Sequence, residues 1–122
     1  MKRSEADLKG FYINVPAIPP SVNNYVRHSR SGIHYKTREA EAFAEMVVLA
    51  ARENRDQKVE AVRVVIAVCL GPGNRGDIDN FPKVVLDSLV RCKAIRSDAS
   101  IEKLVLVKTR GPKPKTEVWV NL

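Results

Sequence analysis

The feature that most constrains the fold is the apolar run over residues 59–70, with the sequence VEAVRVVIAVCL. The run is rich in β-branched side chains, and a turn-forming stretch, Gly71-Pro72-Gly73-Asn74, ends it. Nearly continuous apolar strands of this kind are typical of central strands that are buried on both faces. We therefore predict that Val59–Leu70 is a central strand with both faces buried.

Periodicity and turn signals predict the remaining elements. Thr37 is the expected N-cap of a first helix, because apolar residues recur at helical spacing after it. Pro82 fits a second helix only in the first turn, where backbone N–H groups have no helical partner. In chain order we expect a strand at Phe11–Val15, a long loop at Ile18–Ile33, a helix from Thr37 to about Asn54, the strand Val59–Leu70, a helix from about Asp79 to Cys92, and strands at Ile101–Thr109 and Thr116–Leu122. The order β-α-β-α-β-β predicts one α+β domain at residues 11–122, a mixed β-sheet covered by two helices, after a flexible N-terminal arm at 1–10.

The charge balance indicates a polyanionic partner. The 122 residues include 21 Lys and Arg against 14 Asp and Glu, a formal net charge of +7. Residues 19–38 and 108–115 contain basic side chains and no acid, which favours contacts with phosphate groups. The basic side chains of the first stretch are Arg27, Arg30, Lys36 and Arg38. A nucleic acid is therefore the expected partner.

No apolar run approaches the roughly 20 residues that a membrane-spanning helix needs, and residues 1–5 (MKRSE) do not begin a secretory signal. We therefore expect no membrane partner and a cytoplasmic protein. Cys69 and Cys92 lack metal-binding spacing, so we expect both to be reduced and buried.

A cluster of acids stands out in this basic chain. Asp77 and Asp79 lie one residue apart at the start of the second predicted helix, and Asp98 follows after a short basic segment. Six extended residues span at most about 20 Å, so Asp98 can just return to the start of that helix. Two carboxylates about 4 Å apart repel by roughly 4 kcal/mol at an effective dielectric constant near 20. Three converging carboxylates thus indicate a bound cation, and oxygen ligands favour Mg²⁺, with Mn²⁺ as a substitute.

A purely structural interpretation of some of these acids stays open. Asp79, Lys83, Asp87 and Arg91 follow one another at intervals of four, so they form an alternating ladder on one helix face. Asp79 also suits a helix N-cap. Asp77 lies outside the ladder, and neither of these explanations accounts for it.

Two separate motifs resemble the RusA family of Holliday junction resolvases, which is common in prophages. One motif is Asp77-x-Asp79-Asn80-x-x-Lys83-x-x-x-Asp87-x-Leu89, followed by Asp98. The other is Pro19-Pro20-Ser21-x-Asn23-x-x-x-Arg27, followed by Gly32, Tyr35 and Thr37. The resemblance covers about residues 11–122, and both motifs occur in the family's order.

The resemblance implies a homodimeric endonuclease that binds four-way DNA junctions in recombination and repair. With Mg²⁺ and no small organic cofactor, such an enzyme nicks two strands symmetrically. Asp77, Asp79 and Asp98 match the metal-binding acids, Lys83 matches the essential lysine, and Asn80 matches a residue that contacts DNA. Further DNA-binding candidates are Arg75, Asn23, Arg27, Arg30, Lys36 and Arg38.

Two departures from the family pattern are visible. Ser97 stands where the family often has a second acid, and Arg75 stands alone where an arginine run is usual. Two other functions stay open, namely a basic DNA-binding protein without catalysis and a flap or RNA nuclease that uses the same site.

Overall fold

The computed structural model describes residues 10–19, 26–28, 34–36, 38–54, 59–60, 63–72 and 82–122, with backbone alone for 26–28 and 34–36. The elements in chain order are β1 (Phe11–Val15), β2 (Val26–His28), β3 (His34–Lys36), α1 (Arg38–Ala51), a 3-10 turn η3 (Arg52–Asn54), β4 (Arg63–Leu70), α2 (Pro82–Arg91), a 3-10 turn η5 (Asp98–Ser100), β5 (Lys103–Arg110) and β6 (Lys115–Val120). The predicted class is confirmed, because a mixed four-stranded sheet and two helices form one α+β domain.

The main sheet has the strand order β1-β6-β4-β5, so β4 is an interior strand as predicted. β4 pairs in parallel with β5 and antiparallel with β6, and β1 pairs antiparallel with β6. Because parallel neighbours need a long crossover connection, α2 lies between β4 and β5 in the chain. The first and last strands are therefore direct neighbours.

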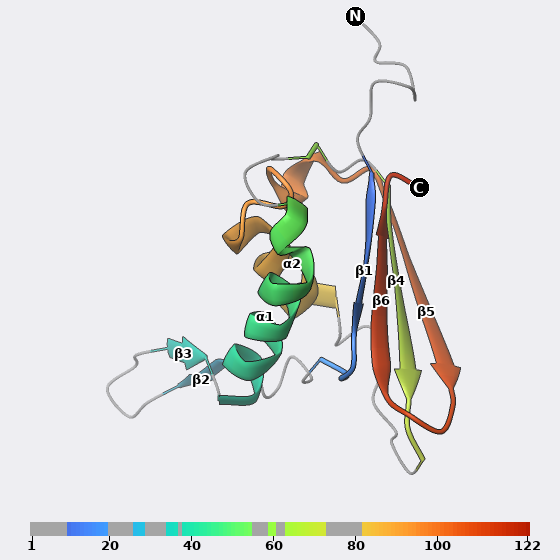
Figure 1. Ribbon diagram of the computed structural model, residues 1–122. Helices are drawn as coiled ribbons and strands as arrows, with labels where there is room; N and C mark the ends of the chain where they lie inside the picture. Colours follow the sequence, from blue (N-terminus) through green and yellow to red (C-terminus); the bar gives the residue numbers. More distant parts are fainter. Residues whose placement is uncertain are drawn as a thin grey trace, which may run out of the picture.

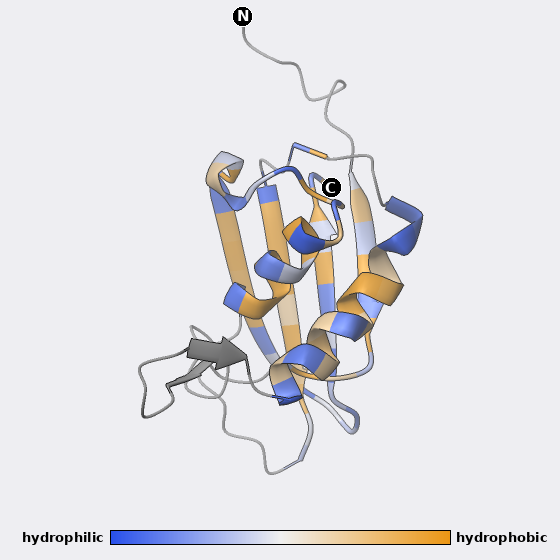
Figure 2. Cartoon of the chain, turned by 90° about the vertical axis from the view of Figure 1, so that its left-hand side faces the viewer, coloured by the Kyte–Doolittle hydropathy of each residue, from blue (hydrophilic) through white to orange (hydrophobic). Residues whose placement is uncertain are grey.

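Both helices cover the same face of the sheet (Figures 1 and 2). α1 buries Phe43 and Val47 in the core, and α2 buries Val85 and Leu89. Val85 and Leu89 lie one turn apart, so both face the sheet, as the helical spacing predicts. Phe81, which precedes Val85 by one helical turn in the sequence, lies outside the described residues.

The prediction that the central strand is buried on both faces is wrong. Val64, Ile66 and Val68 of β4 are fully buried under the helices, whereas Val65 and Ala67 are only partly buried. Alternate residues of a strand point to opposite faces, and both helices cover one face (Figure 1). The apolar run thus combines a core face with an apolar face that no described element covers.

Several predicted boundaries differ from the structure, and β5 and β6 are each displaced by one or two residues from the predicted ranges. The loop expected at Ile18–Ile33 contains β2, which pairs antiparallel with β3. The strand expected from Val59 begins at Arg63, and Val59 instead forms an isolated parallel bridge with Ile95. The first helix reaches its predicted end at Asn54, but only as an α-helix to Ala51, and its last three residues form the 3-10 turn η3. Thr37, the expected N-cap, lies outside the described residues.

A buried asparagine ties the end of β6 to the start of β4. Asn121 is 8% exposed and has a positive φ of 55°, a conformation that asparagine tolerates better than most residues. Its Oδ1 accepts a hydrogen bond from the Arg63 N–H at 3.0 Å, and its Nδ2 donates to the Glu60 carbonyl at 3.0 Å. The Asn121 N–H also donates to the Arg63 carbonyl at 2.8 Å. The Asn121 side chain therefore supplies hydrogen-bond partners for backbone groups just beyond the last paired residues of β4 and β6.

The prediction for the cysteines is confirmed, because Cys69 and Cys92 are both buried and free. In the described part of the chain, no helix combines the length and apolarity needed to cross a membrane.

Candidate active site

Two of the four predicted catalytic residues, Lys83 and Asp98, belong to the described part of the chain. Asp77 and Asp79 do not, nor do the predicted DNA-binding residues Asn23, Arg30, Arg75 and Asn80.

Lys83 lies in the first turn of α2, directly after Pro82. Pro82 supplies a backbone angle suited to the first helical position, so it fixes where the helix begins. The Lys83 side chain is 58% exposed, and its Nζ lies 3.5 Å from the Asp87 carboxylate one turn later. This contact is the pair expected from the helix ladder, and it leaves most of the lysine side chain open to solvent.

Asp98 follows a turn that closes the other end of α2. Lys93 has a φ of 65°, and the N–H groups of Ala94 and Ile95 both donate to the Leu89 carbonyl, at 3.0 and 3.3 Å. A left-handed residue that satisfies the last helical carbonyls is a common helix C-cap. The Arg96 N–H then donates to the Val59 carbonyl at 2.9 Å. The segment before Asp98 is therefore folded and anchored, not extended as the reach estimate from the sequence assumed.

Asp98 is the first residue of η5, and its side chain is exposed. Its carboxylate forms no hydrogen bond or ion pair with the other described residues, so it is available to bind a cation or a substrate group. Lys83 lies in the first turn of α2, whereas η5 follows the C-terminal end of that helix in the chain. Among the described residues, no group of three or more His, Cys, Asp or Glu could hold a metal. The site of three carboxylates stays a prediction, because it depends on Asp77 and Asp79.

Three of the basic DNA-binding candidates, Arg27, Lys36 and Arg38, belong to the described part of the chain. Arg38 is the first residue of α1, and its side chain is exposed. The backbone of Arg27 pairs with Tyr35, and that of Lys36 pairs with Val26, in the hairpin of β2 and β3. This hairpin directly precedes α1, so three of the predicted basic residues come from one continuous stretch of the fold (Figure 1).

The family model described as endodeoxyribonuclease RusA matches residues 16–121, nearly the whole chain. The chain belongs to the RusA family. A comparison with curated proteins finds no significant match. Membership makes this chain part of a nuclease family that hydrolyses DNA and acts on branched junctions.

Ser97 has a structural role in this RusA-family chain. Its backbone is extended, and its Oγ accepts a hydrogen bond from the Ala99 N–H at 3.1 Å, so it is the N-cap of η5. Aspartate and serine are both good N-caps. Serine at position 97 therefore caps the turn that carries Asp98 without placing a second negative charge beside it.

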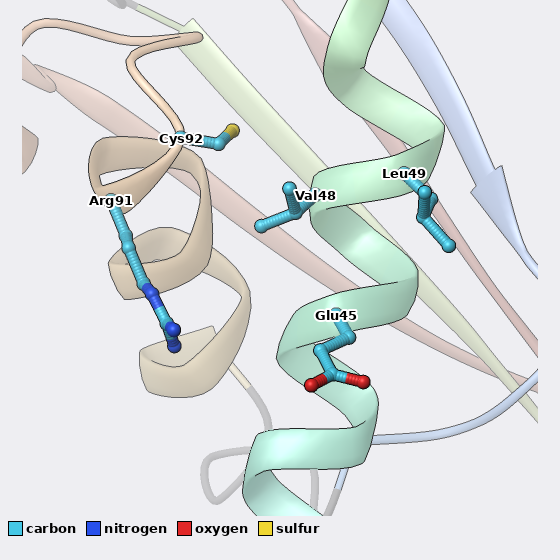
Figure 3. Close-up of a pocket in the computed structure, with 5 residues that line it drawn as sticks. All are labelled: Glu45, Val48, Leu49, Arg91 and Cys92. Carbon is cyan, nitrogen blue, oxygen red and sulfur yellow. The ribbon is translucent and has the colours of Figure 1, made fainter.

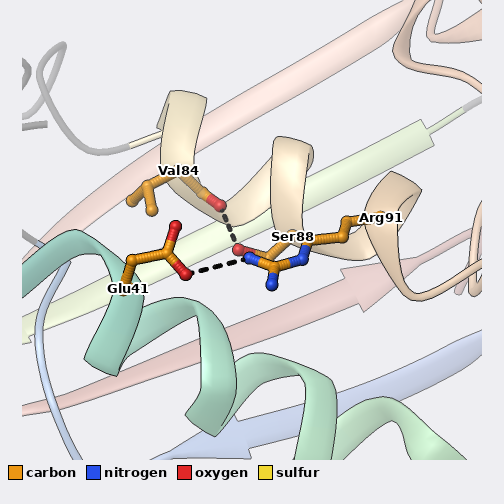
Figure 4. A network of polar contacts seen from close by, with 4 residues as sticks. All are labelled: Glu41, Val84, Ser88 and Arg91. Carbon is orange, nitrogen blue, oxygen red and sulfur yellow. Dashed lines mark hydrogen bonds and ion pairs between the residues drawn. The ribbon is translucent and has the colours of Figure 1, made fainter. Parts of the chain in front are cut away.

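The sequence did not predict the contact between α1 and α2 in this RusA-family fold. The Arg91 guanidinium of α2 donates to the Glu41 carboxylate of α1 at 3.2 Å (Figure 4). Within α2, the buried Ser88 hydroxyl donates to the Val84 carbonyl at 2.6 Å (Figure 4). Residues 41 and 91 lie far apart in the sequence, and no local pattern pairs them.

An open pocket of about 400 Å³ lies between the two helices (Figure 3). Val48 and Cys92 point toward one another across it. The lining residues are Glu45, Val48, Leu49, Arg91 and Cys92. No predicted catalytic or DNA-binding residue lines this pocket, so we assign no catalytic role to it.

Proposed function

We propose that this RusA-family chain is a Mg²⁺-dependent endonuclease that resolves four-way DNA junctions by paired symmetric nicks. The observation that carries the proposal is the family match over residues 16–121. The two motifs quoted from the sequence support it, because they supply the acids, the lysine and the basic loop within that span.

Asp77, Asp79 and Asp98 would hold the metal. Their donor atoms are all carboxylate oxygens, which suit Mg²⁺ and Mn²⁺ better than zinc. A bound ion of this kind supplies an activated water and charge neutralisation for hydrolysis of a phosphodiester. The exposed carboxylate of Asp98, on an anchored turn, is compatible with this role.

Lys83 would contact the phosphate under attack. Its side chain is 58% exposed and lies at the N-terminal end of α2, where the helix dipole also favours negative charge. Asp87 competes for the same ammonium group at 3.5 Å. Because such a surface pair contributes little free energy, a DNA phosphate can replace the carboxylate without a large loss.

DNA binding would come from phosphate contacts and from the shape of the junction. Asn23, Arg27, Arg30, Lys36, Arg38, Arg75 and Asn80 are the proposed contact residues. Phosphate contacts position a protein on DNA without reading its sequence. Two symmetric nicks need two copies of a chain with one site, so a two-fold homodimer is part of the proposal.

The decisive experiment compares Asp79→Asn and Asp98→Asn with the matched control Glu102→Gln. Glu102 is an exposed acid four residues after Asp98, and it is outside the proposed site. We expect both aspartate variants to bind junctions but to lose roughly 10²-fold or more in cleavage, the scale of a lost charge-stabilising contact. The control should cut like the wild type, and a chelator should stop all cleavage.

The result that would overturn the catalytic assignment is undiminished Mg²⁺-dependent cleavage by either aspartate variant. Junction binding without cleavage by the wild type under any metal condition would instead favour a non-catalytic DNA-binding protein. Preferential cleavage of flaps or RNA over four-way junctions would leave the site in place and overturn the proposed substrate.

A further inference from the structure

A basic surface at one end of the main sheet has no part in the proposed active site. The sequence between positions 103 and 116 contains five basic residues and no acid, and it spans β5, the turn after it and the start of β6. Lys108, Arg110 and Lys113 follow one another closely in this stretch, and all three are exposed. We call these three residues the basic strip.

Lys108 and Arg110 leave β5 on the face of the sheet that carries the helices. Lys108 pairs in register with Val68, and Arg110 pairs with Leu70. Both partners are fully buried under the helices, and residues paired in this way point to the same face of a sheet. β5 is an edge strand, and its last four residues are all exposed. The helices therefore do not bury either basic side chain.

The basic strip lies at the edge of the sheet toward which α2 begins. β4 and β5 are parallel, so their C-terminal ends lie at the same edge. The segment after α2 lies beside the segment before β4, because Ile95 forms a parallel bridge with Val59 and the Arg96 N–H donates to the Val59 carbonyl at 2.9 Å. α2 thus runs back against β4, and its first turn, with Lys83, is directed toward the edge where β4 and β5 end. DNA that reaches Lys83 can therefore continue along the strip.

The turn that carries Lys113 is held against the end of β4. This connection passes β4, which lies between β5 and β6 in the sheet (Figure 1). The Gly111 N–H donates to the Leu70 carbonyl at 3.2 Å, and a β-carbon at Gly71 would lie 3.3 Å from the Pro114 Cδ. Prolines on both sides of Lys113 also restrict the backbone. Because the turn is already restrained, little backbone freedom is lost when Lys113 binds a ligand.

The charges of the basic strip suit a row of phosphates. Lys108 and Lys113 form no hydrogen bond or ion pair with the other described residues, so no described carboxylate competes for their ammonium groups. Alternate residues of a strand lie about 6.6 Å apart, and each strand of duplex DNA has one phosphate per about 3.4 Å of helix axis. Lys108 and Arg110 can therefore contact different phosphates of one DNA strand.

We propose that the basic strip binds the sugar-phosphate backbone of a duplex arm of branched DNA and fixes the direction in which that arm leaves α2. The choice of DNA as the polyanion rests on the proposed function. Lysine on an edge strand can also serve only to prevent pairing with another sheet. That role predicts no change in DNA affinity when the lysine is replaced.

The test measures binding of the full chain to a synthetic four-way junction by fluorescence anisotropy over a range of salt concentrations. A chelator is present so that no DNA is cut. Lys108→Gln and Lys113→Gln each remove one charge from the basic strip. Lys103→Gln is the matched control, because Lys103 is an exposed lysine at the opposite end of β5. Lys108→Arg keeps the charge and should bind like the wild type.

The expected result is a weaker dependence of junction affinity on salt. The slope of log affinity against log salt concentration should become shallower by about one for each phosphate contact that is lost. Such a contact changes the affinity roughly eightfold per tenfold change in salt, so each strip variant should bind roughly fivefold more weakly at about 0.1 M salt. Lys103→Gln should keep the wild-type slope. An unbranched duplex should show the same differences, because the strip contacts the backbone and not the branch point.

Three results would overturn the proposal: an unchanged slope for either strip variant that circular dichroism shows to be folded, an equal change in slope for Lys103→Gln, or a change with single-stranded DNA but not with duplex DNA. The second result would reflect net charge alone, and the third would assign the strip a different partner. Cleavage separates this proposal from the proposed function. A wild type that binds junctions and never cuts them refutes only the nuclease, whereas cleavage with unchanged slopes in the variants refutes only the strip.

Discussion

Replacement of Asn121 by alanine tests how much one side chain stabilises the contact between the end of β6 and the start of β4. The change removes the Oδ1 acceptor of the Arg63 N–H and the Nδ2 donor to the Glu60 carbonyl, each at 3.0 Å. It also leaves alanine at a φ of 55°, where a β-carbon is unfavourable. The sheet topology is retained, so the variant should fold but should be less stable.

The magnitude follows from these two losses. A hydrogen bond contributes about 0.5–1.5 kcal/mol net, and more where a partner is left buried without a replacement. The left-handed backbone adds about 1 kcal/mol for a residue other than glycine or asparagine. We therefore expect the free energy of unfolding to fall by about 3 kcal/mol. At an unfolding entropy of about 2.1 cal/mol/K per residue, this corresponds to a decrease in Tm of roughly 12 °C.

Thermal and urea unfolding, followed by circular dichroism, measure the change. Asn121→Gly keeps the backbone conformation and loses only the side-chain bonds, so it should be intermediate. Asn121→Asp keeps the acceptor for Arg63 and loses the donor to Glu60, which separates the two contacts. A Tm for Asn121→Ala within about 3 °C of the wild type, less than 1 kcal/mol, would refute the reasoning.

Three further predictions concern stability. Ser97→Ala should cost about 0.5–1 kcal/mol through loss of the η5 cap, whereas Ser97→Asp should unfold like the wild type in urea. Gly10→Ala should destabilise the domain by about 1–3 kcal/mol in thermal melts, because the new β-carbon would lie 2.7 Å from the Val120 carbonyl oxygen; an unchanged Tm would contradict this. The hydrogen bond from the Tyr12 hydroxyl is the main cause that lowers the pKa of Glu117 in the folded state. The ionised Glu117 carboxylate therefore stabilises the fold at pH values above its ordinary pKa near 4.5. This contribution is lost as the pH falls through the lowered pKa of the folded state. Urea unfolding between about pH 6 and pH 3 should therefore show a shallower loss of stability for Tyr12→Phe, and identical profiles would argue against the coupling.

The helices and the core could be predicted from the sequence because their signal is local. Val85 and Leu89 recur at helical spacing, and the structure buries both against the sheet. The open face of β4 could not be predicted, because Val65 and Ala67 are apolar residues like their buried neighbours. Whether a second layer covers a strand depends on the whole topology, not on the strand.

In the candidate site, too, local structure could be predicted from the sequence and long-range contacts could not. The motif proposes Lys83 and Asp98 as site residues, and that role stays a prediction, while the structure places Lys83 in the first turn of α2. The path between them was not predicted, since the chain turns at the C-cap residue Lys93 and Arg96 then bonds to Val59, 37 residues earlier in the sequence. The joint geometry of Asp77, Asp79 and Asp98 stays a prediction, because Asp77 and Asp79 lie outside the described residues.

The position of β6 has a consequence for synthesis of the chain. β6 follows the other described strands in the chain, yet it lies between β1 and β4 and pairs with both. Until it leaves the ribosome, β1 has no neighbour in the main sheet and β4 lacks one of its two. Chain ends this distant in sequence must meet before the sheet is complete, which slows folding and exposes apolar strands to aggregation meanwhile. The main sheet of a nascent chain should thus be complete only after β6 has been synthesised, and truncation before β6 should leave β1 without its strand partner in that sheet.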